Sequence, residues 1–208
     1  MQPILLVGVA GVCLMPILGQ TQGLKPAEKK LVQSVEARLP EELAALEKVV
    51  NIDSGTFNAA GVREAGRYFQ EQLEAIGFKT RWASMPEAMH RAGHLIAERV
   101  APQSTGKRVL LIGHLDTIFE GQGHRFQRTG DTIRGAGIID MKGGDIAILY
   151  ALKALHDVGM LEGATVRVFL TGDEENPGTP TDVSRRDLVE IARQATSRSA
   201  LNRTQEER

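Results

Sequence analysis

Apolar residues form two different patterns along this chain. Between residues 60 and 76 they recur at spacings of three and four, which predicts an amphipathic helix over Ala60–Ile76 that Gly77 ends. Two nearly continuous apolar runs, Arg108–Ile112 and Thr165–Leu170, are rich in β-branched residues and predict central strands. The mostly apolar segment Gly144–Val158 between them predicts a buried helix. Strand, helix and strand in this order indicate an α/β fold.

Further elements are predicted on the N-terminal side of this unit. A helix is expected over Ala27–Leu39, and a second one from Pro40 to Val50, because proline is tolerated in the first turn of a helix. The polar segment Asn51–Asn58 is interpreted as an ordinary turn. Phe78–Ala83 and His94–Val100 are candidate strands.

The N-terminus carries an uncharged apolar stretch, Ile4–Leu18. Its length is that of a signal-peptide core and is short for a membrane span. We therefore expect residues 1–23 to be a signal peptide and the protein to be secreted or periplasmic. The absence of Lys or Arg between Met1 and Ile4 argues against this expectation. The alternative is a buried strand or helix in a cytoplasmic protein.

Composition excludes several classes of protein. The 208 residues suffice for one domain with a real core, and a formal net charge of -1 gives no reason to expect nucleic acid or an anionic membrane as a partner. Cys13 is the only cysteine, so neither a disulfide framework nor a thiolate zinc site is possible.

Three short polar segments follow the apolar runs: GHLDT (113–117), GAGIIDMKGG (135–144) and TGDEEN (171–176). One imidazole and four of their carboxylates form a candidate site at the ends of predicted strands: His114, Asp116, Asp140, Glu174 and Glu175. Charged groups gathered in a protein interior are costly unless they are paired, so such a cluster normally surrounds a cation. Imidazole and carboxylate are ligands for zinc or a similar divalent metal.

His114 and Asp116 are two residues apart where a strand ends, so both side chains can point to the same side. A histidine that binds a metal usually donates its other N–H to a carboxylate. This favours His114 as a ligand and Asp116 as the group that orients it. A buried His–Asp pair that satisfies only itself is the alternative.

Asp140 lies in a glycine-rich turn before a helix, and a carboxylate there can bridge two cations. Phosphate-binding loops are the alternative for such a turn. A dinucleotide fingerprint needs a third glycine where Asp140 stands, and a P-loop needs Ser or Thr where Gly143 stands, so neither matches.

Glu174 and Glu175 are adjacent carboxylates that repel each other unless a cation or a shared proton relieves them. We expect Glu175 to bind a metal and Glu174 to act as a general base that takes a proton from water. A solvated acidic turn is the alternative, and Asp173 is interpreted as a capping or supporting group.

With these motifs, the chain resembles the zinc-dependent peptidase and deacylase family that includes carboxypeptidase G, aminoacylase, acetylornithine deacetylase and succinyl-diaminopimelate desuccinylase. The resemblance rests on the three segments in the family's order and runs from about Leu24 to Gln194. It implies a three-layer α/β catalytic domain, over residues 24–194, with a mostly parallel central sheet. NIDSGT and SRRDLVE look closest to the carboxypeptidase-G-like branch.

The resemblance also implies a site and a reaction. His114 is a ligand of one zinc ion, Asp140 bridges two, and Glu175 is a ligand of the other. Glu174 is the catalytic base, and Asp116 supports His114. The implied reaction is hydrolysis of an amide next to a free carboxylate, on a small peptide or an N-acyl amino acid.

The chain departs from the family in its second half. The family's next acidic ligand, its lid or dimerisation domain and its final histidine are missing, so the metal site and the sheet are expected to be incomplete, with apolar strand edges exposed. Residues 195–208 are patternless, and we interpret them as an aberrant tail that a frameshift could explain. A truncated, inactive fragment is therefore the alternative to an active hydrolase. A third and weaker alternative is the related zinc aminopeptidase class, which the DMKGG turn disfavours.

Overall fold

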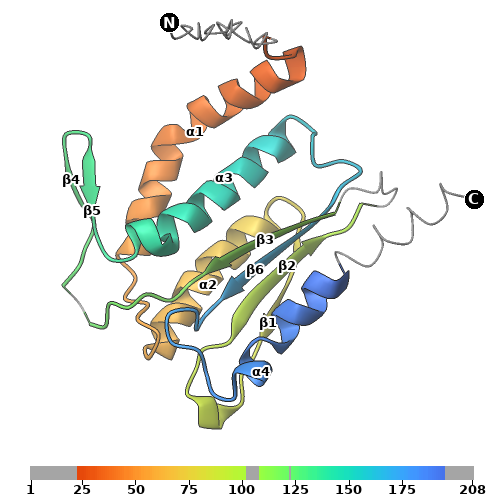
Figure 1. Ribbon diagram of the computed structural model, residues 1–208. Helices are drawn as coiled ribbons and strands as arrows, with labels where there is room; N and C mark the ends of the chain where they lie inside the picture. Colours follow the sequence, from red (N-terminus) through yellow and green to blue (C-terminus); the bar gives the residue numbers. More distant parts are fainter. Residues whose placement is uncertain (1–22, 102–107, 122, 195–208) are drawn as a thin grey trace, which may run out of the picture.

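The computed structural model describes residues 23–101, 108–121 and 123–194 (Figure 1). The predicted signal peptide, apart from Gly23, and the predicted tail at 195–208 lie outside the described residues. Within the described ranges, no helix is both long enough and apolar enough to cross a membrane.

The secondary structure alternates between helices and strands. The elements are α1 (Pro26–Val50), α2 (Ala59–Glu74), β1 (Lys79–Ala83), η1 (Glu87–Met89), β2 (His94–Arg99), β3 (Arg108–His114), β4 (Gln127–Thr129), β5 (Thr132–Arg134), η2 (Ile138–Lys142), α3 (Gly143–Asp157), β6 (Thr165–Thr171) and α4 (Thr181–Ser184). A further helical segment covers residues 186–194. The predicted α/β class is confirmed.

The central sheet has the strand order β1-β2-β6-β3. The pairs β1–β2 and β2–β6 are antiparallel, and only β3–β6 is parallel. The described sheet is therefore mixed, and the expectation of a mostly parallel sheet was wrong for this part of it. The reason is the connections: a short one joins β1 to β2, whereas only the path from β3 to β6 contains a crossover helix, α3.

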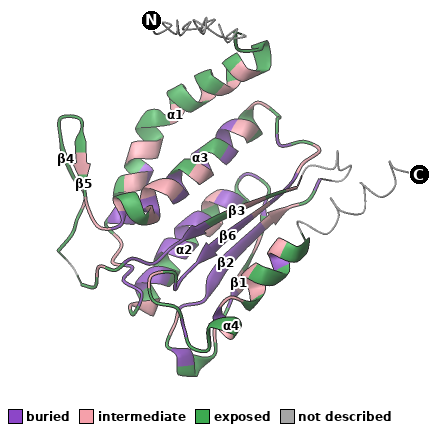
Figure 2. Cartoon of the chain, viewed as in Figure 1, coloured by how far each residue is buried: buried purple, intermediate pink, exposed green. Residues whose placement is uncertain are grey.

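Helices cover the sheet on both faces, which gives three layers (Figures 1 and 2). On one face, α2 and α3 pack against the strands and α1 packs against α3, around buried Val49, Phe69, Leu149 and Val168. On the other face, Ile191 from the helical segment 186–194 packs against Ile96 and Phe169. Side chains at successive strand positions point to opposite faces, so Val168 and Phe169 belong to different layers.

Helix α1 continues through Pro40, so the prediction of two separate helices was wrong. Proline removes one hydrogen bond of the helix, but tertiary contacts hold α1 on both sides of it. Before Pro40, Arg38 Nη2 lies 2.6 Å from Asp157 Oδ2 of α3. After it, Glu41 Oε1 accepts a 3.0 Å hydrogen bond from Lys153 Nζ, also of α3.

A free strand edge lies at the end of the sheet in the described part of the chain. β3 is the last strand there, and the side chains of Val109 and Ile112 are exposed. This agrees with the expectation that apolar strand edges would be exposed.

The first turn of α3 buries Asp145 against β3. Its side chain is almost completely buried, and neither carboxylate oxygen has a hydrogen-bond partner among the described residues. Gly113 makes this approach possible, because a Cβ atom at Gly113 would lie 1.9 Å from Asp145 Oδ1. Burial raises the pKa of Asp145 well above its usual value, an effect to which Asp116 adds and which His114 partly offsets.

Asp145→Asn should therefore stabilise the protein at neutral pH. Because the folded state disfavours the charged carboxylate, stability should fall as pH rises above the unfolded-state pKa of about 4, and the neutral amide should avoid this loss. We expect the free energy of unfolding of Asp145→Asn to exceed that of the unchanged protein by about 1 to 3 kcal/mol at about pH 7. The difference should shrink towards about pH 4. Urea unfolding in the presence of EDTA measures it.

The control is Asp182→Asn, at an exposed position of α4. It should not raise the free energy of unfolding at about pH 7, because it relieves no buried carboxylate. A lower stability of Asp145→Asn at neutral pH would show that Asp145 is charged and paired in the folded protein.

Candidate metal centre

Parallel pairing of β3 with β6 brings two of the three polar segments together. His114, the last residue of β3, lies opposite Thr171, the last residue of β6. The residues that follow these two strands therefore leave the sheet at the same edge. The loop before α3 reaches the same place, and it supplies Asp140.

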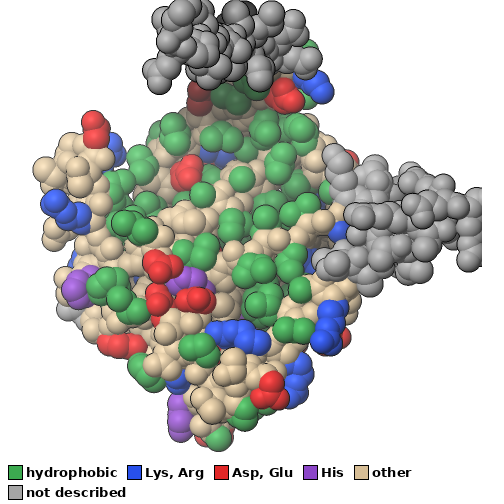
Figure 3. Space-filling view, viewed as in Figure 1, with side chains coloured by type: hydrophobic (Ala, Val, Ile, Leu, Met, Phe, Trp, Pro, Cys, Tyr) green, Lys and Arg blue, Asp and Glu red, His purple; other side chains and the backbone are tan. Residues whose placement is uncertain are grey.

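His114, Asp140 and Glu175 form a group that could hold a metal ion. Each offers one ligand atom, and the three atoms lie within 4.8 Å of one another. Figure 3 shows acidic side chains gathered beside a histidine on the face of the molecule that also carries the β4–β5 hairpin. The structure thus brings together the three residues that the sequence suggested as metal ligands.

Both ring nitrogens of buried His114 face oxygen atoms. Nδ1 lies 2.9 Å from the Asp116 carbonyl oxygen and 3.6 Å from Asp116 Oδ1, and Nε2 lies 2.9 Å from Asp140 Oδ1. Burial disfavours the charged ring, but hydrogen bonds to Asp116 and Asp140 outweigh this effect and raise the pKa of His114 to about 9. Its closest contact with Asp116 is to the backbone, not to the predicted carboxylate.

The carboxylate of Asp116 is completely buried and fully engaged. It accepts hydrogen bonds from Thr56 Oγ1 at 2.7 Å, from the Glu174 N–H at 3.0 Å and from the Glu175 N–H at 3.1 Å. Burial alone would raise the pKa of Asp116, but contacts with His114, Thr56 and these two N–H groups hold it below its usual value. Asp116 therefore positions the turn that carries both glutamates.

The turn before α3 is held by Lys142. Its buried Nζ donates a 2.8 Å hydrogen bond to the Ile52 carbonyl oxygen. Burial lowers the pKa of Lys142 to about 8, although nearby Asp53 favours the charged form. Gly137 has a φ of +70°, and a Cβ atom there would lie 2.5 Å from Thr117 Cγ2, so this position requires glycine.

Glu174 and Glu175 occupy different positions in the site. Glu175 belongs to the ligand group, whereas Glu174 Oε2 lies 4.0 Å from His114 Nε2, outside that group. The Glu174 side chain is 54% exposed and the Asp140 side chain 72% exposed. Burial, followed by repulsion from Asp140, raises the pKa of Glu175, and His114 partly offsets this.

Asp173, the first acidic residue of the turn, points away from the metal group. Its buried carboxylate accepts hydrogen bonds from the Gly178 N–H at 2.8 Å, Ser184 Oγ at 2.6 Å and Arg185 Nη1 at 2.6 Å. It therefore fastens the chain after the turn to the end of β6, as expected of a supporting group.

The segment 54–56, interpreted from sequence as an ordinary turn, contributes to the site. The Thr117 N–H donates to the Ser54 carbonyl oxygen at 2.9 Å, and the Thr56 N–H donates to the Thr117 carbonyl oxygen at 3.1 Å. These bonds place the Thr56 hydroxyl against Asp116. A polar turn carries no periodic pattern, so the residues alone gave no signal for this contact.

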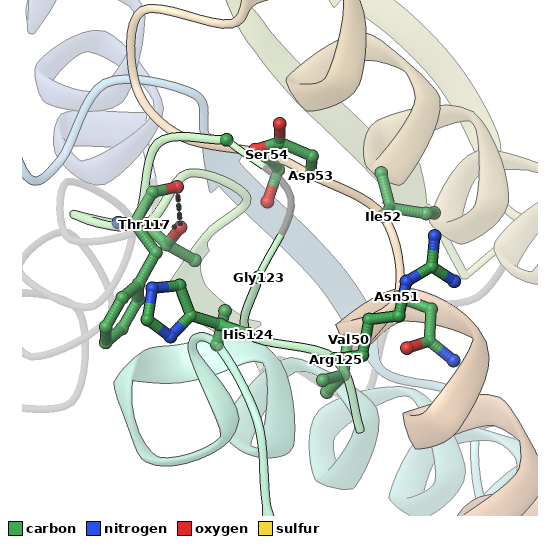
Figure 4. A pocket seen from close by; sticks show the side chains of 12 residues that line it. Val50, Asn51, Ile52, Asp53, Ser54, Thr117, Gly123, His124 and Arg125 are labelled. Carbon is green, nitrogen blue, oxygen red and sulfur yellow. Dashed lines mark hydrogen bonds between the residues drawn. The ribbon is translucent and has the colours of Figure 1, made fainter. Parts of the chain in front are cut away.

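Two cavities lie near these segments, and only one could accept a substrate. The first has a volume of about 20 Å³ and places Asp53 and Ser54 across from Thr117 and His124 (Figure 4). That volume suits a single water molecule. The second, of about 470 Å³, is lined in part by Asp140 and Glu175. Its size is typical of small-molecule sites.

The donor set fits zinc. Imidazole nitrogen and carboxylate oxygen are both zinc ligands, and three protein ligands are the number found in catalytic zinc sites, which keep a further position open for water or substrate. The Nδ1–H bond of His114 to the Asp116 carbonyl oxygen leaves Nε2 as the nitrogen that would hold the ion.

Comparison with known proteins gives relatives for this site. The sequence matches the Peptidase family M20/M25/M40 over residues 110–201. Carboxypeptidase G2 of Pseudomonas sp. (strain RS-16) is 32% identical over 174 residues, which are 80% of this chain and 40% of the relative. Succinyl-diaminopimelate desuccinylase of Novosphingobium aromaticivorans is 29% identical over 126 residues, or 58% of this chain and 32% of the relative.

Solved structures share the fold. The di-peptidase Dug1p from Saccharomyces cerevisiae superposes with a TM-score of 0.65 at 16% identity, over 82% of this chain and 39% of that protein. The chain thus spans about two fifths or less of the length of each of these proteins. Motifs, fold and relatives agree, and the chain contains a domain of peptidase family M20/M25/M40, homologous to carboxypeptidase G2 and succinyl-diaminopimelate desuccinylase.

Proposed function

We propose that this chain carries the metal-binding part of a hydrolase that cleaves an amide bond next to a free carboxylate. The observation that supports this most directly is the convergence of His114, Asp140 and Glu175 within 4.8 Å, with Glu174 beside them. The names of the relatives, a carboxypeptidase, a desuccinylase and a di-peptidase, support amide hydrolysis on peptides or acylated amino acids.

Each residue of the site has a separate role in the proposed hydrolysis. When bound, a zinc ion supplies a Lewis acid that polarises a carbonyl group and makes water more acidic. His114, Asp140 and Glu175 would hold it. Glu174 is exposed, carries no structural hydrogen bond through its side chain among the described residues, and is free to take a proton from water and return it to the leaving amine. Asp116 orients His114 and holds the backbone of both glutamates.

The number of metal ions is a separate part of the proposal. The family pattern implies two zinc ions that share Asp140, whereas the described residues supply one group of three ligands. Metal analysis of the purified chain distinguishes the possibilities: two ions support a complete site, one ion a partial site, and none an inactive fragment.

Zinc affinity should rise with pH. His114 must lose a proton to bind zinc through Nε2, and its pKa of about 9 means that it is protonated at neutral pH before zinc binds. We expect the apparent association constant to increase about tenfold per pH unit between about pH 6 and 8, with release of about one proton. Calorimetry in buffers of different ionisation enthalpy measures both quantities.

His156→Gln is the control, because His156 is an exposed histidine of α3 away from the site. It should leave the affinity and the pH slope unchanged, whereas His114→Ala should lower the affinity at least about 100-fold. A slope near zero in the unchanged protein would contradict the role of His114 as a ligand.

In a full-length relative or a restored version of this chain, Glu174→Gln should abolish turnover but not metal binding. The amide keeps the shape of the side chain but cannot take the proton, so kcat for hydrolysis of N-acyl amino acids should fall about 100-fold or more. Zinc affinity should stay within about threefold, because Glu174 does not belong to the ligand group.

The matched control is Glu36→Gln, on the exposed face of α1. It should keep full activity. If Glu174→Gln strips the zinc while Glu175→Gln retains it, the roles of the two glutamates are reversed.

A further inference from the structure

The larger cavity beside the metal group is apolar. It has a volume of about 470 Å³ and is lined by side chains of three segments, the loop after β3, strand β5 and the start of η2: Ile118, Phe119, Ile133, Ile138 and Ile139. We name it the isoleucine pocket. Asp140 and Glu175 line the same cavity, so a molecule in the pocket would touch the groups expected to hold the metal.

The apolar side chains of the pocket are unusually open to solvent. Ile139 is 95% exposed and Ile118 is 68% exposed. Large apolar side chains grouped on a surface commonly mark a binding site, since covering them removes apolar area from water. Ile139 directly precedes Asp140 in the chain, so a ligand that covers it also lies next to this carboxylate.

One wall of the pocket is held in place. The Phe119 N–H contacts Thr117 Oγ1 at 3.3 Å, and the Phe119 ring packs on His124 with a centroid distance of 4.8 Å. Thr117 is buried and is bonded to the segment 54–56, which also contacts Asp116. The pocket and the metal group are therefore parts of one connected structure.

The isoleucine pocket has one cationic lining residue, Arg134 of β5. Its side chain is exposed, and it forms no ion pair with any of the described residues. A guanidinium group presents paired N–H donors that match a carboxylate. Asp140 and Glu175 line the same cavity, so its lining combines apolar side chains with one cationic and two acidic residues.

We infer that the isoleucine pocket binds the apolar side chain of a substrate amino acid, such as leucine, and that Arg134 binds its free carboxylate. This inference rests on the proposed function, because it places the scissile amide beside Asp140 and Glu175. The cavity volume accommodates a leucine-sized side chain with room for the carboxylate.

Binding of small ligands tests the inference without turnover. The probes are N-acetyl-L-leucine, N-acetylglycine and N-acetyl-L-leucinamide, and their dissociation constants are measured by NMR titration of the chain in EDTA. We expect N-acetyl-L-leucine to bind about tenfold more tightly than N-acetylglycine, because its side chain is buried, and about tenfold more tightly than the uncharged amide.

Two variants assign these preferences to residues. Ile139→Asn should remove the preference for leucine over glycine, and Arg134→Gln should remove the preference for the carboxylate over the amide. Both side chains are exposed, so the fold should tolerate both changes. Ile112→Asn, at an exposed apolar position of the β3 edge, is the matched control and should change neither preference.

Equal binding of the leucine and glycine probes, or no binding at millimolar concentration, overturns the inference, as does a loss in Ile139→Asn that is the same for both probes. Absence of binding is the result expected if another part of the protein covers the pocket. Because EDTA removes the metal, the result does not depend on the proposed hydrolysis. Selective binding by a chain that binds no zinc would contradict the proposed function and leave the pocket assignment standing.

Discussion

The buried carboxylate of Asp116 is the contact on which the arrangement of the site depends. It joins three segments that are far apart in the sequence: the turn that contains Thr56, the end of β3, and the turn with both glutamates. A buried charge is tolerated only when hydrogen bonds compensate for its lost hydration. Here the compensating donors are the groups that need to be positioned, so the requirement to satisfy Asp116 also builds the site.

Electrostatic repulsion explains why some carboxylates of the site are exposed to solvent while others are buried. Asp140, Glu174 and Glu175 lie close together, and His114 is the cationic side chain that the structure places among them. The side chains of Asp140 and Glu174 are exposed to solvent, where water screens their charges. Asp116 and Asp173 are buried instead, because each has its own set of donors. The site thus separates carboxylates that support the fold from those that face a ligand.

Local sequence predicted the elements and the ligand group, because both depend on short-range patterns. Apolar runs marked β3 and β6, and the chemistry of the residues after them indicated His114 and Glu175. Contacts between distant segments could not be predicted in this way. The bond from Thr56 to Asp116, the continuation of α1 through Pro40 and the antiparallel pairing of β2 with β6 all depend on partners at least 30 residues away in the sequence. The buried position of Asp145 likewise depends on Gly113, 32 residues earlier.

The acidic turn after β6 separates its three carboxylates by direction. Asp173 points into the protein towards Ser184 and Arg185, while Glu174 and Glu175 face the other polar segments. The three side chains carry the same charge, so they differ in the site only by their distance along the chain from the end of β6. Adding or removing a single residue there would turn a different carboxylate inward without altering the composition of the turn. The arrangement of the site therefore depends more on the length of this turn than on how many acidic residues it contains.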